Sequence, residues 1–318
     1  MALYIEYNLR KISDNYLNMK KLCHNVCFIF PLKCCTNKQI LEIVYEYADG
    51  FDVSNENEYN YISEYLNNKT ICSTGPLSKE LIKKRDVLVA VNSVSSWEKG
   101  CGIRVNFNYD DSFIKSHFGV SLSEIPLEIT SNSKYVHFHI SDRRTKEIKQ
   151  KIIHQIVKVL ELFPKLEILN IGGHLTNMPQ DEAVSYINCI RGILPENIKL
   201  IVEAGDYFVD RCGFLHCKVI DVFFNGTSQI VYLNVSKESQ LRWSHPRIAS
   251  PFCRASDTLF NTVFYGASCY ENDIIAKSIC SKLKVGDEVV FENITTYSSE
   301  WNKSFNGLKE IETIFREW

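Results

Sequence analysis

The sequence lacks several signals that would assign it at once to a large class of proteins. None of its twelve cysteines forms a Cys-x-x-Cys pair, which excludes a zinc ribbon and a thioredoxin-type motif. No apolar run approaches the roughly eighteen residues of a membrane-spanning helix, and the first residues lack the basic and apolar segments of a signal peptide. We therefore expect a cytoplasmic protein with reduced thiols and no membrane partner.

The chain also lacks an excess of charge of either sign. Its 318 residues include 36 Lys and Arg against 38 Asp and Glu, so the net charge of -2 gives no basic field to attract nucleic acid. The length is sufficient for a barrel and a smaller second domain. A small molecule is therefore the expected partner.

What the sequence does contain is a lysine at the end of an apolar run. Lys33 directly follows the uncharged residues 26–32. A lysine amine that is shielded from water has a lowered pKa and keeps a reactive lone pair, as Schiff-base chemistry with a carbonyl cofactor requires. Alternatively, the side chain extends from a strand end into water, which is a purely structural arrangement.

Short apolar runs alternate with longer amphipathic segments between residues 26 and 203. This pattern is typical of strand–helix units around a parallel sheet, and eight such strands predict a closed (β/α)₈ barrel, an α/β fold. The predicted strands are residues 26–32, 50–53, 70–73, 87–91, 102–107, 135–140, 166–171 and 200–203. The predicted helices include residues 36–48, 55–66, 145–163 and 180–193.

Beyond residue 203 the pattern changes. Strand-like runs at 214–224, 230–235 and 289–291 appear without helical segments between them, with turn signals such as Asn225-Gly226. These runs predict a second, antiparallel β domain. We expect the barrel to span residues 8–207 and the β domain to span residues 208–318, together with residues 1–7.

Polar residues stand at the ends of four predicted strands. Lys33 follows the first, His139 lies near the end of the sixth, Gly172 and Gly173 follow the seventh, and Glu203 ends the eighth. Because the carboxyl ends of barrel strands face one mouth, we expect these residues to converge there. Taken singly, the paired glycines could form a phosphate-binding or an ordinary turn, and Glu203 could be a paired structural carboxylate.

His137 and His139 alternate on one predicted strand, a spacing that also occurs in metal sites. A third ligand would be required, and His117 or Asp142 would be the candidate. Because no other part of the chain has metal-ligand spacing, we expect no metal.

Seven short segments are specific when taken together and in order. They are Phe-Pro-Leu-Lys-Cys-Cys-Thr-Asn at 30–37, Gly-Phe-Asp-Val-Ser at 50–54, Val-His-Phe-His at 136–139, Leu-Asn-Ile-Gly-Gly-His at 169–174, Val-Glu-Ala-Gly-Asp at 202–206, Gly-Ala-Ser-Cys-Tyr-Glu-Asn-Asp at 266–273 and Ser-Phe-Asn-Gly at 304–307. In this order the chain resembles the fold-type III pyridoxal-phosphate decarboxylases of the ornithine and diaminopimelate decarboxylase group. The resemblance implies a barrel of alanine-racemase type followed by a β domain.

The resemblance also implies roles for residues of the barrel. Lys33 would hold pyridoxal 5'-phosphate covalently, His139 would stack on its ring, and Glu203 would pair with the ring nitrogen. Gly172 and Gly173 would approach the phosphate. Alanine racemases carry an arginine at the position of Glu203, which weakens the electron sink, so the carboxylate favours decarboxylation.

Further matches concern the phosphate, the substrate and a partner subunit. Tyr297 and the turn at 204–206 would contact the phosphate. Cys269 would reach into the partner subunit's site and return a proton to the α-carbon, so the resemblance implies a homodimer with shared active sites. Arg104 and His117 resemble further site residues of the family. The resemblance implies that Arg104 binds the substrate.

Departures from the family pattern bear on the substrate. Ornithine decarboxylases carry an arginine after the Glu-Pro-Gly turn and an acid directly after the loop cysteine, where this sequence has Asp206 and Tyr270. These features look more like the carboxynorspermidine decarboxylase branch, although His174 replaces that branch's third glycine. We expect a small cationic amino acid, carboxynorspermidine-like or a diamino acid, with Asp206, Glu271 and Asp273 as candidate counter-charges for its distal ammonium.

The sequence leaves three alternatives open. The chain could remove carboxylate from a 3-amino-3-carboxypropyl group on another scaffold in a biosynthetic pathway such as polyamine biosynthesis. It could be an amino-acid racemase on the same barrel, or a non-catalytic protein that binds the cofactor or regulates another protein. Release of carbon dioxide and uptake of the cofactor distinguish these alternatives.

Overall fold

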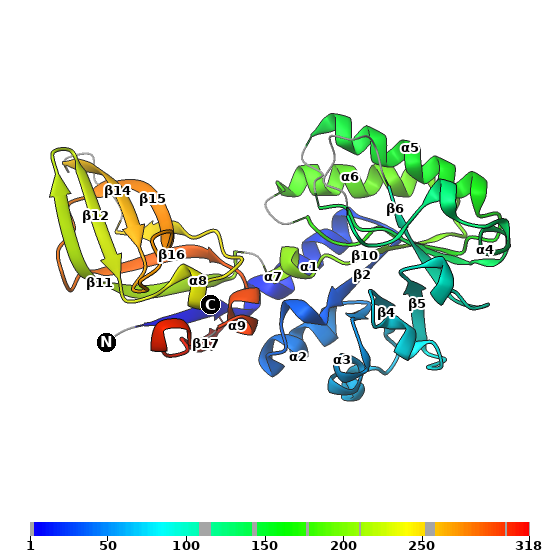
Figure 1. Ribbon diagram of the computed structural model, residues 1–318, viewed down its shortest axis with the longest axis horizontal. Coiled ribbons are helices and arrows are strands. Elements are labelled where there is room, and N and C mark those ends of the chain that lie inside the picture. Colours follow the sequence, from blue (N-terminus) through cyan, green and yellow to red (C-terminus); the bar gives the residue numbers. More distant parts are fainter. Residues whose placement is uncertain are drawn as a thin grey trace. The chain divides into compact units, whose positions relative to one another are not determined.

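A computed structural model of the protein describes residues 3–107, 116–141, 145–175, 178–209, 211–251, 258–302 and 304–317 (Figure 1). The chain divides into two units. One, the barrel unit, comprises Asn15–Lys33 and Val44–Phe208. The other, the β unit, comprises Met1–Asp14, Cys34–Ile43 and Val209–Trp318.

The described part of the barrel unit contains a closed ring of eight parallel strands. Pairing of the last strand with the first closes the ring, and the remaining neighbours follow the order of the chain. The strands are β2 (Val26–Pro31), β3 (Gly50–Val53), β4 (Thr70–Thr74), β5 (Val87–Val91), β6 (Gly102–Asn106), β8 (Tyr135–His137), β9 (Ile168–Asn170) and β10 (Lys199–Val202). A short strand, β7 (Val120–Ser121), pairs with β6. The predicted (β/α)₈ barrel is confirmed, and each predicted strand overlaps an observed one.

The longer helices in the described residues bury one apolar face each, as their periodicity predicts. In α5 the side chain of Thr145 accepts a hydrogen bond from the Ile148 N–H at the helix start, and Ile152, Ile156 and Val159 are buried. The predicted helix at 55–66 is interrupted, because α3 ends at Tyr61 and a separate turn follows. The longer helices are α1 (Leu9–Leu22), α2 (Lys38–Tyr47), α5 (Lys146–Leu162) and α6 (Gln180–Ile193); the shorter are α3 (Glu56–Tyr61), α4 (Leu127–Asn132), α7 (Gly205–Val209), α8 (Lys237–Gln240) and α9 (Tyr297–Glu300).

The β unit contains a mainly antiparallel sheet, as predicted, with two parallel pairs, β1 with β17 and β12 with β14. The first strand of the chain joins this sheet by pairing with β11. Gly226, in the turn between β11 and β12, has a φ of 59°, a conformation that glycine adopts without strain. The strands are β1 (Tyr4–Asn8), β11 (Gly213–Asn225), β12 (Ser228–Leu233), β13 (Arg247–Ser250), β14 (Leu259–Tyr265), β15 (Ile274–Ser281), β16 (Glu288–Ile294) and β17 (Glu312–Arg316).

Residues 34–43 belong to the β unit although they follow the first barrel strand in the chain. The Thr296 hydroxyl donates to the Cys34 carbonyl at 2.8 Å, and the Thr36 N–H donates to Glu300 Oε1 at 2.7 Å. These bonds join segments more than 260 positions apart, which is why no local pattern in the sequence indicated them.

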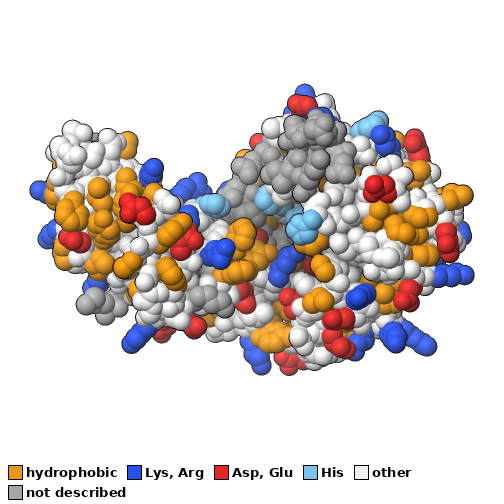
Figure 2. All heavy atoms as spheres, in the orientation of Figure 1, with side chains coloured by type: hydrophobic (Ala, Val, Ile, Leu, Met, Phe, Trp, Pro, Cys, Tyr) orange, Lys and Arg blue, Asp and Glu red, His pale blue; other side chains and the backbone are white. Residues whose placement is uncertain are grey.

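The surface shows no field of a single charge sign on the face that Figure 2 presents, where Lys and Arg side chains alternate with Asp and Glu over the barrel unit. This distribution agrees with the net charge of -2. No helix of the described residues is both long and apolar enough to cross a membrane.

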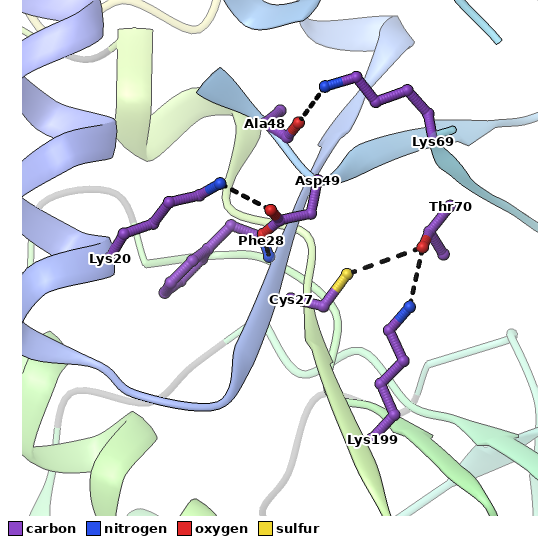
Figure 3. A network of polar contacts seen from close by, with 8 residues as sticks. All are labelled: Lys20, Cys27, Phe28, Ala48, Asp49, Lys69, Thr70 and Lys199. Atoms are coloured by element: carbon purple, nitrogen blue, oxygen red, sulfur yellow. Dashed lines mark hydrogen bonds and ion pairs between the residues drawn. The ribbon is translucent and has the colours of Figure 1, made fainter. Parts of the chain in front are cut away.

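Polar contacts connect the amino ends of the barrel strands (Figure 3). Asp49, directly before β3, accepts hydrogen bonds from Lys20 Nζ at 2.6 Å and from the Phe28 N–H at 2.8 Å. Lys199, the first residue of β10, donates to Thr70 Oγ1 at 2.8 Å. This end of a barrel usually serves stability, because active sites lie at the opposite end of the strands.

We predict that Asp49→Ala lowers the free energy of unfolding by about 1–3 kcal/mol, because the Phe28 N–H and the Lys20 ammonium lose their carboxylate acceptor. Urea unfolding measures the change. The matched control is Glu167→Ala, which removes an ion pair with Lys134 in which both side chains are more than half exposed, and it should change the stability by at most about 0.5 kcal/mol. An equal loss of stability in the two variants would contradict the stabilising role assigned to Asp49.

Candidate active site

A cavity of about 690 Å³ lies at the carboxyl ends of the barrel strands. The structure brings five of the predicted site residues to its wall: Lys33, Arg104, His117, His139 and Glu203. They are separated by as many as 170 positions in the sequence. Further lining residues are Ser54, Thr74, Phe118, His137 and Ser141.

Lys33 lies in a 3₁₀ turn, Leu32–Cys34, directly after β2. Residues 27–32 are buried, but Lys33 itself is exposed and lines the cavity. The expectation that the apolar run shields the amine from water is therefore wrong. The reason is that β2 ends at Pro31, and the turn that follows places Lys33 at the open mouth of the barrel.

Glu203 follows β10 and has a side chain that is only 2% exposed. Its Oε1 accepts a hydrogen bond from Asn170 Nδ2 at 2.8 Å and lies 3.3 Å from His137 Nε2. Burial alone would raise the pKa of Glu203, but His137 and the charges of Lys33 and His139 outweigh burial and lower that pKa. Burial also lowers the pKa of His137, against the opposing attraction of Glu203. Glu203 therefore carries its negative charge in a buried setting.

Asp52 is a buried acid that interacts electrostatically with Glu203, Lys33 and Arg104, and the sequence analysis gave it no role. It lies in β3, where every residue is buried, and its Oδ1 has no hydrogen-bond partner among the described residues. Burial and the charge of Glu203 raise the pKa of Asp52 well above its usual range, against the attraction of Lys33 and Arg104. The signal that could have found it is an acid inside an otherwise apolar strand.

Gly172 and Gly173 follow β9 and pack against the site residues. Gly172 has a φ of 66°, and a Cβ on Gly173 would lie 2.2 Å from the backbone oxygen of Glu203. The Gly173 N–H donates to His139 Nδ1 at 3.2 Å, and the Gly172 N–H donates to Asn170 Oδ1 at 2.9 Å. The glycines therefore allow the ends of β8, β9 and β10 to approach closely, and their contact with a phosphate stays a prediction.

Arg104 extends from β6 along the cavity wall. Its Nη1 donates to Thr74 Oγ1 at 3.3 Å, and its guanidinium lies 4.6 Å from the centre of the Phe118 ring. Within the described residues, no three His, Cys, Asp or Glu side chains are grouped so that they could hold a metal ion. Asp142, one of the two candidate third ligands for zinc, lies outside the described residues.

Tyr297 and Cys269 belong to the β unit. The Tyr297 hydroxyl lies 3.1 Å from the Sγ of Cys34, the residue that follows Lys33 in the chain. Cys269 is exposed in the loop between β14 and β15, and its N–H donates to Asn306 Oδ1 at 3.2 Å. The Gly-x-x-Cys and Phe-Asn-Gly segments therefore meet, although 37 positions separate Cys269 from Asn306.

The three candidate counter-charges differ in their surroundings. Asp273 is buried, and its two oxygens accept hydrogen bonds from the N–H groups of Lys237 at 2.7 Å and Ser268 at 3.2 Å. Asp273 therefore stabilises the loop that carries Cys269. Glu271 is exposed in the same loop, and Asp206 lies in α7 of the barrel unit.

Comparisons with known proteins agree with this architecture. A family model described as "Pyridoxal-dependent decarboxylase, C-terminal sheet domain" matches residues 43–295. The chain is 24% identical to antizyme inhibitor 1 from mouse, over 97% of this chain and 81% of that protein. It is 22% identical to the carboxynorspermidine/carboxyspermidine decarboxylase of Campylobacter jejuni, over 85% of this chain and 80% of that protein. The crystal structure of Paramecium bursaria Chlorella virus arginine decarboxylase bound to agmatine shares the fold, with a TM-score of 0.79, 17% identity, and coverage of 99% of this chain and 96% of that one.

We predict that Gly173→Ala lowers the free energy of unfolding by about 1–3 kcal/mol, because the added methyl group would overlap the backbone of Glu203. Gly192→Ala in α6 is the matched control. A Cβ there meets nothing within 4 Å, so the same change in a helix should raise the stability by roughly 0.5–1 kcal/mol. Urea unfolding of both variants measures the difference, and a Gly173 variant as stable as the wild type would contradict the close packing.

Proposed function

Because the chain belongs to the pyridoxal-dependent decarboxylases, carboxy-lyases whose cofactor is pyridoxal 5'-phosphate, we propose that it removes the α-carboxylate of a small cationic amino acid. One observation carries the proposal: an accessible amine, Lys33, and a buried ionised carboxylate, Glu203, stand on the wall of one cavity. The Campylobacter relative, named a carboxynorspermidine/carboxyspermidine decarboxylase, supports an amine-bearing substrate.

The residues of the cavity fit this cofactor. An accessible lysine amine is the group that binds an aldehyde covalently, and Lys33 is accessible. The ionised Glu203 suits a protonated ring nitrogen. When bound, the cofactor supplies an electron sink for the electron pair that the departing carboxylate leaves on the α-carbon.

The protein's own groups then have distinct tasks. Lys33 holds the cofactor in the cavity, and His139 flanks it from the end of β8. Glu203 stays negative and so favours the protonated form of the group beside it. An arginine in its place would disfavour that form, which is the physical reason for preferring decarboxylation to racemisation.

We assign the return of a proton to the α-carbon to Cys269, whose thiol is exposed. This assignment requires a homodimer in which Cys269 of each subunit acts in the site of the other subunit. It is supported by the anchoring of the Cys269 backbone to Asn306, because a loop that presents a reactive group must be held in place. Asp206 and Glu271 are the proposed counter-charges for the distal ammonium of the substrate.

We predict that Lys33 is the only lysine that becomes linked to the cofactor. After incubation with pyridoxal 5'-phosphate and reduction with borohydride, peptide mass analysis should place the added mass on Lys33. Lys33→Ala should carry none and release no carbon dioxide. Lys199→Ala, which removes a lysine from the opposite end of the barrel strands, should keep both the label and the turnover. A label that persists in the Lys33 variant would remove the mechanism.

We predict that amino acids with a distal amine release carbon dioxide faster than neutral ones of similar length. Carboxynorspermidine, ornithine, lysine and 3-amino-3-carboxypropyl compounds on other scaffolds form the test set, with norleucine as the neutral control. Product masses identify the amine that forms. Loss of optical activity without carbon dioxide would instead indicate a racemase. Failure to take up the cofactor would favour a non-catalytic protein that regulates another protein; the mouse relative is named as an inhibitor of antizyme.

A further inference from the structure

One buried amide connects the parts of the barrel cavity. Asn170, the last residue of β9, is fully buried. Its Nδ2 donates to Glu203 Oε1 at 2.8 Å and to the Tyr135 hydroxyl at 3.0 Å. Its Oδ1 accepts the N–H of Gly172 at 2.9 Å. The three bonds connect Asn170 to a side chain of β8, to the turn after β9 and to the residue that follows β10.

The chemistry of the partners fixes the orientation of this amide. A backbone N–H can only donate, so the atom that faces Gly172 must be the oxygen of Asn170. The nitrogen must then face Glu203, and an ionised carboxylate can only accept. No aspartate can make this set of contacts while it is ionised, because it has no N–H to offer.

We propose that Asn170 is a positioning residue that holds the carboxylate of Glu203 at the cavity wall and, through the same side chain, fixes the turn at Gly172. The inference rests on the proposed function in so far as Glu203 acts on the cofactor. A neutral donor suits this task, since it satisfies the carboxylate without cancelling its charge. The charge of Glu203 then remains available to a cation in the cavity.

Other charged and titratable groups also act on Glu203. His137 of β8 lies 3.3 Å from it, and Glu203 interacts electrostatically with groups of other strands and strand ends: Lys33, His139, Arg104, Asp52, Cys72 and Tyr135. Each of these groups is unchanged in a variant of Asn170. A difference in pH dependence between such variants therefore reports on position 170.

Asn170→Asp is the decisive variant, because it places a second carboxyl group at hydrogen-bond distance from Glu203. Two carboxylates at such a short distance cannot both ionise, so the pair must hold one proton in the folded state. The pKa for this proton is therefore higher in the folded protein than in the unfolded chain. A carboxyl group whose pKa is raised by folding stabilises the folded protein at low pH, and this stabilisation is lost as the pH rises. The gap in melting temperature between wild type and variant, measured without cofactor, should therefore widen by about 4 °C or more between about pH 5 and pH 8.

Two controls separate this effect from packing. Asn170→Ala removes the amide without adding a charge, and Tyr135→Phe removes only the other acceptor of Nδ2. Both should lower the melting temperature by an amount that stays constant over the same pH range. A constant gap for Asn170→Asp as well would overturn the inference.

Cofactor uptake gives a second readout, which also serves if Asn170→Asp does not fold. In an absorbance titration with pyridoxal 5'-phosphate, Asn170→Ala should bind about tenfold or more weakly than the wild type, since a hydrogen bond to a charged group is lost. Tyr135→Phe should bind nearly as well as the wild type. Equal binding by wild type and Asn170→Ala would count against the inference. A wild type that takes up no cofactor would sink the proposed function, and the melting experiment would still test the contact between Asn170 and Glu203.

Discussion

A negative charge buried in the wall of the barrel is the constraint on which the site depends. Glu203 is almost completely shielded from water, and an isolated carboxylate in that position would take up a proton. It stays ionised because Asn170 donates a hydrogen bond to it, His137 lies beside it and Lys33 supplies a positive charge at the same cavity. The four residues come from four different strand ends, so the charge exists only when the ring of strands is closed.

Much of this fold could be predicted from the sequence because barrel strands that are buried on both faces form continuous apolar runs. The predicted bounds of β3 and β5 match the observed ones, and those of the other barrel strands differ by a few residues. The β unit was less predictable. Strands such as β14 and β15 alternate buried with exposed residues over short spans, and this weak signal did not indicate them.

Site residues could be predicted from the sequence where their position relative to a strand determines their location. They could not be predicted where contacts with residues distant in the sequence determine their role. Lys33, His139 and Glu203 could be placed at the cavity because each follows a strand. The roles of Asn170 and Asp52 depend on which groups face them across the barrel, and no local pattern contains that information. The exposure of Lys33 was wrongly predicted for a related reason, since the turn after β2, and not the apolar strand itself, decides where the amine lies.

The partners of Glu203 also explain why this charge can do chemical work. A carboxylate paired with a buried arginine would be satisfied and electrically cancelled, and a cationic ligand would gain little from it. Here the hydrogen-bonded donor is a neutral amide, which holds the carboxylate in place while its charge persists. Under the proposed function, a protonated ring nitrogen in the cavity would meet a negative charge that its hydrogen-bond donor does not cancel, in a medium of low polarity where the attraction is much stronger than in water. A neutral hydrogen-bond donor for a buried charge is thus the feature that would suit this barrel to an electron-accepting ring.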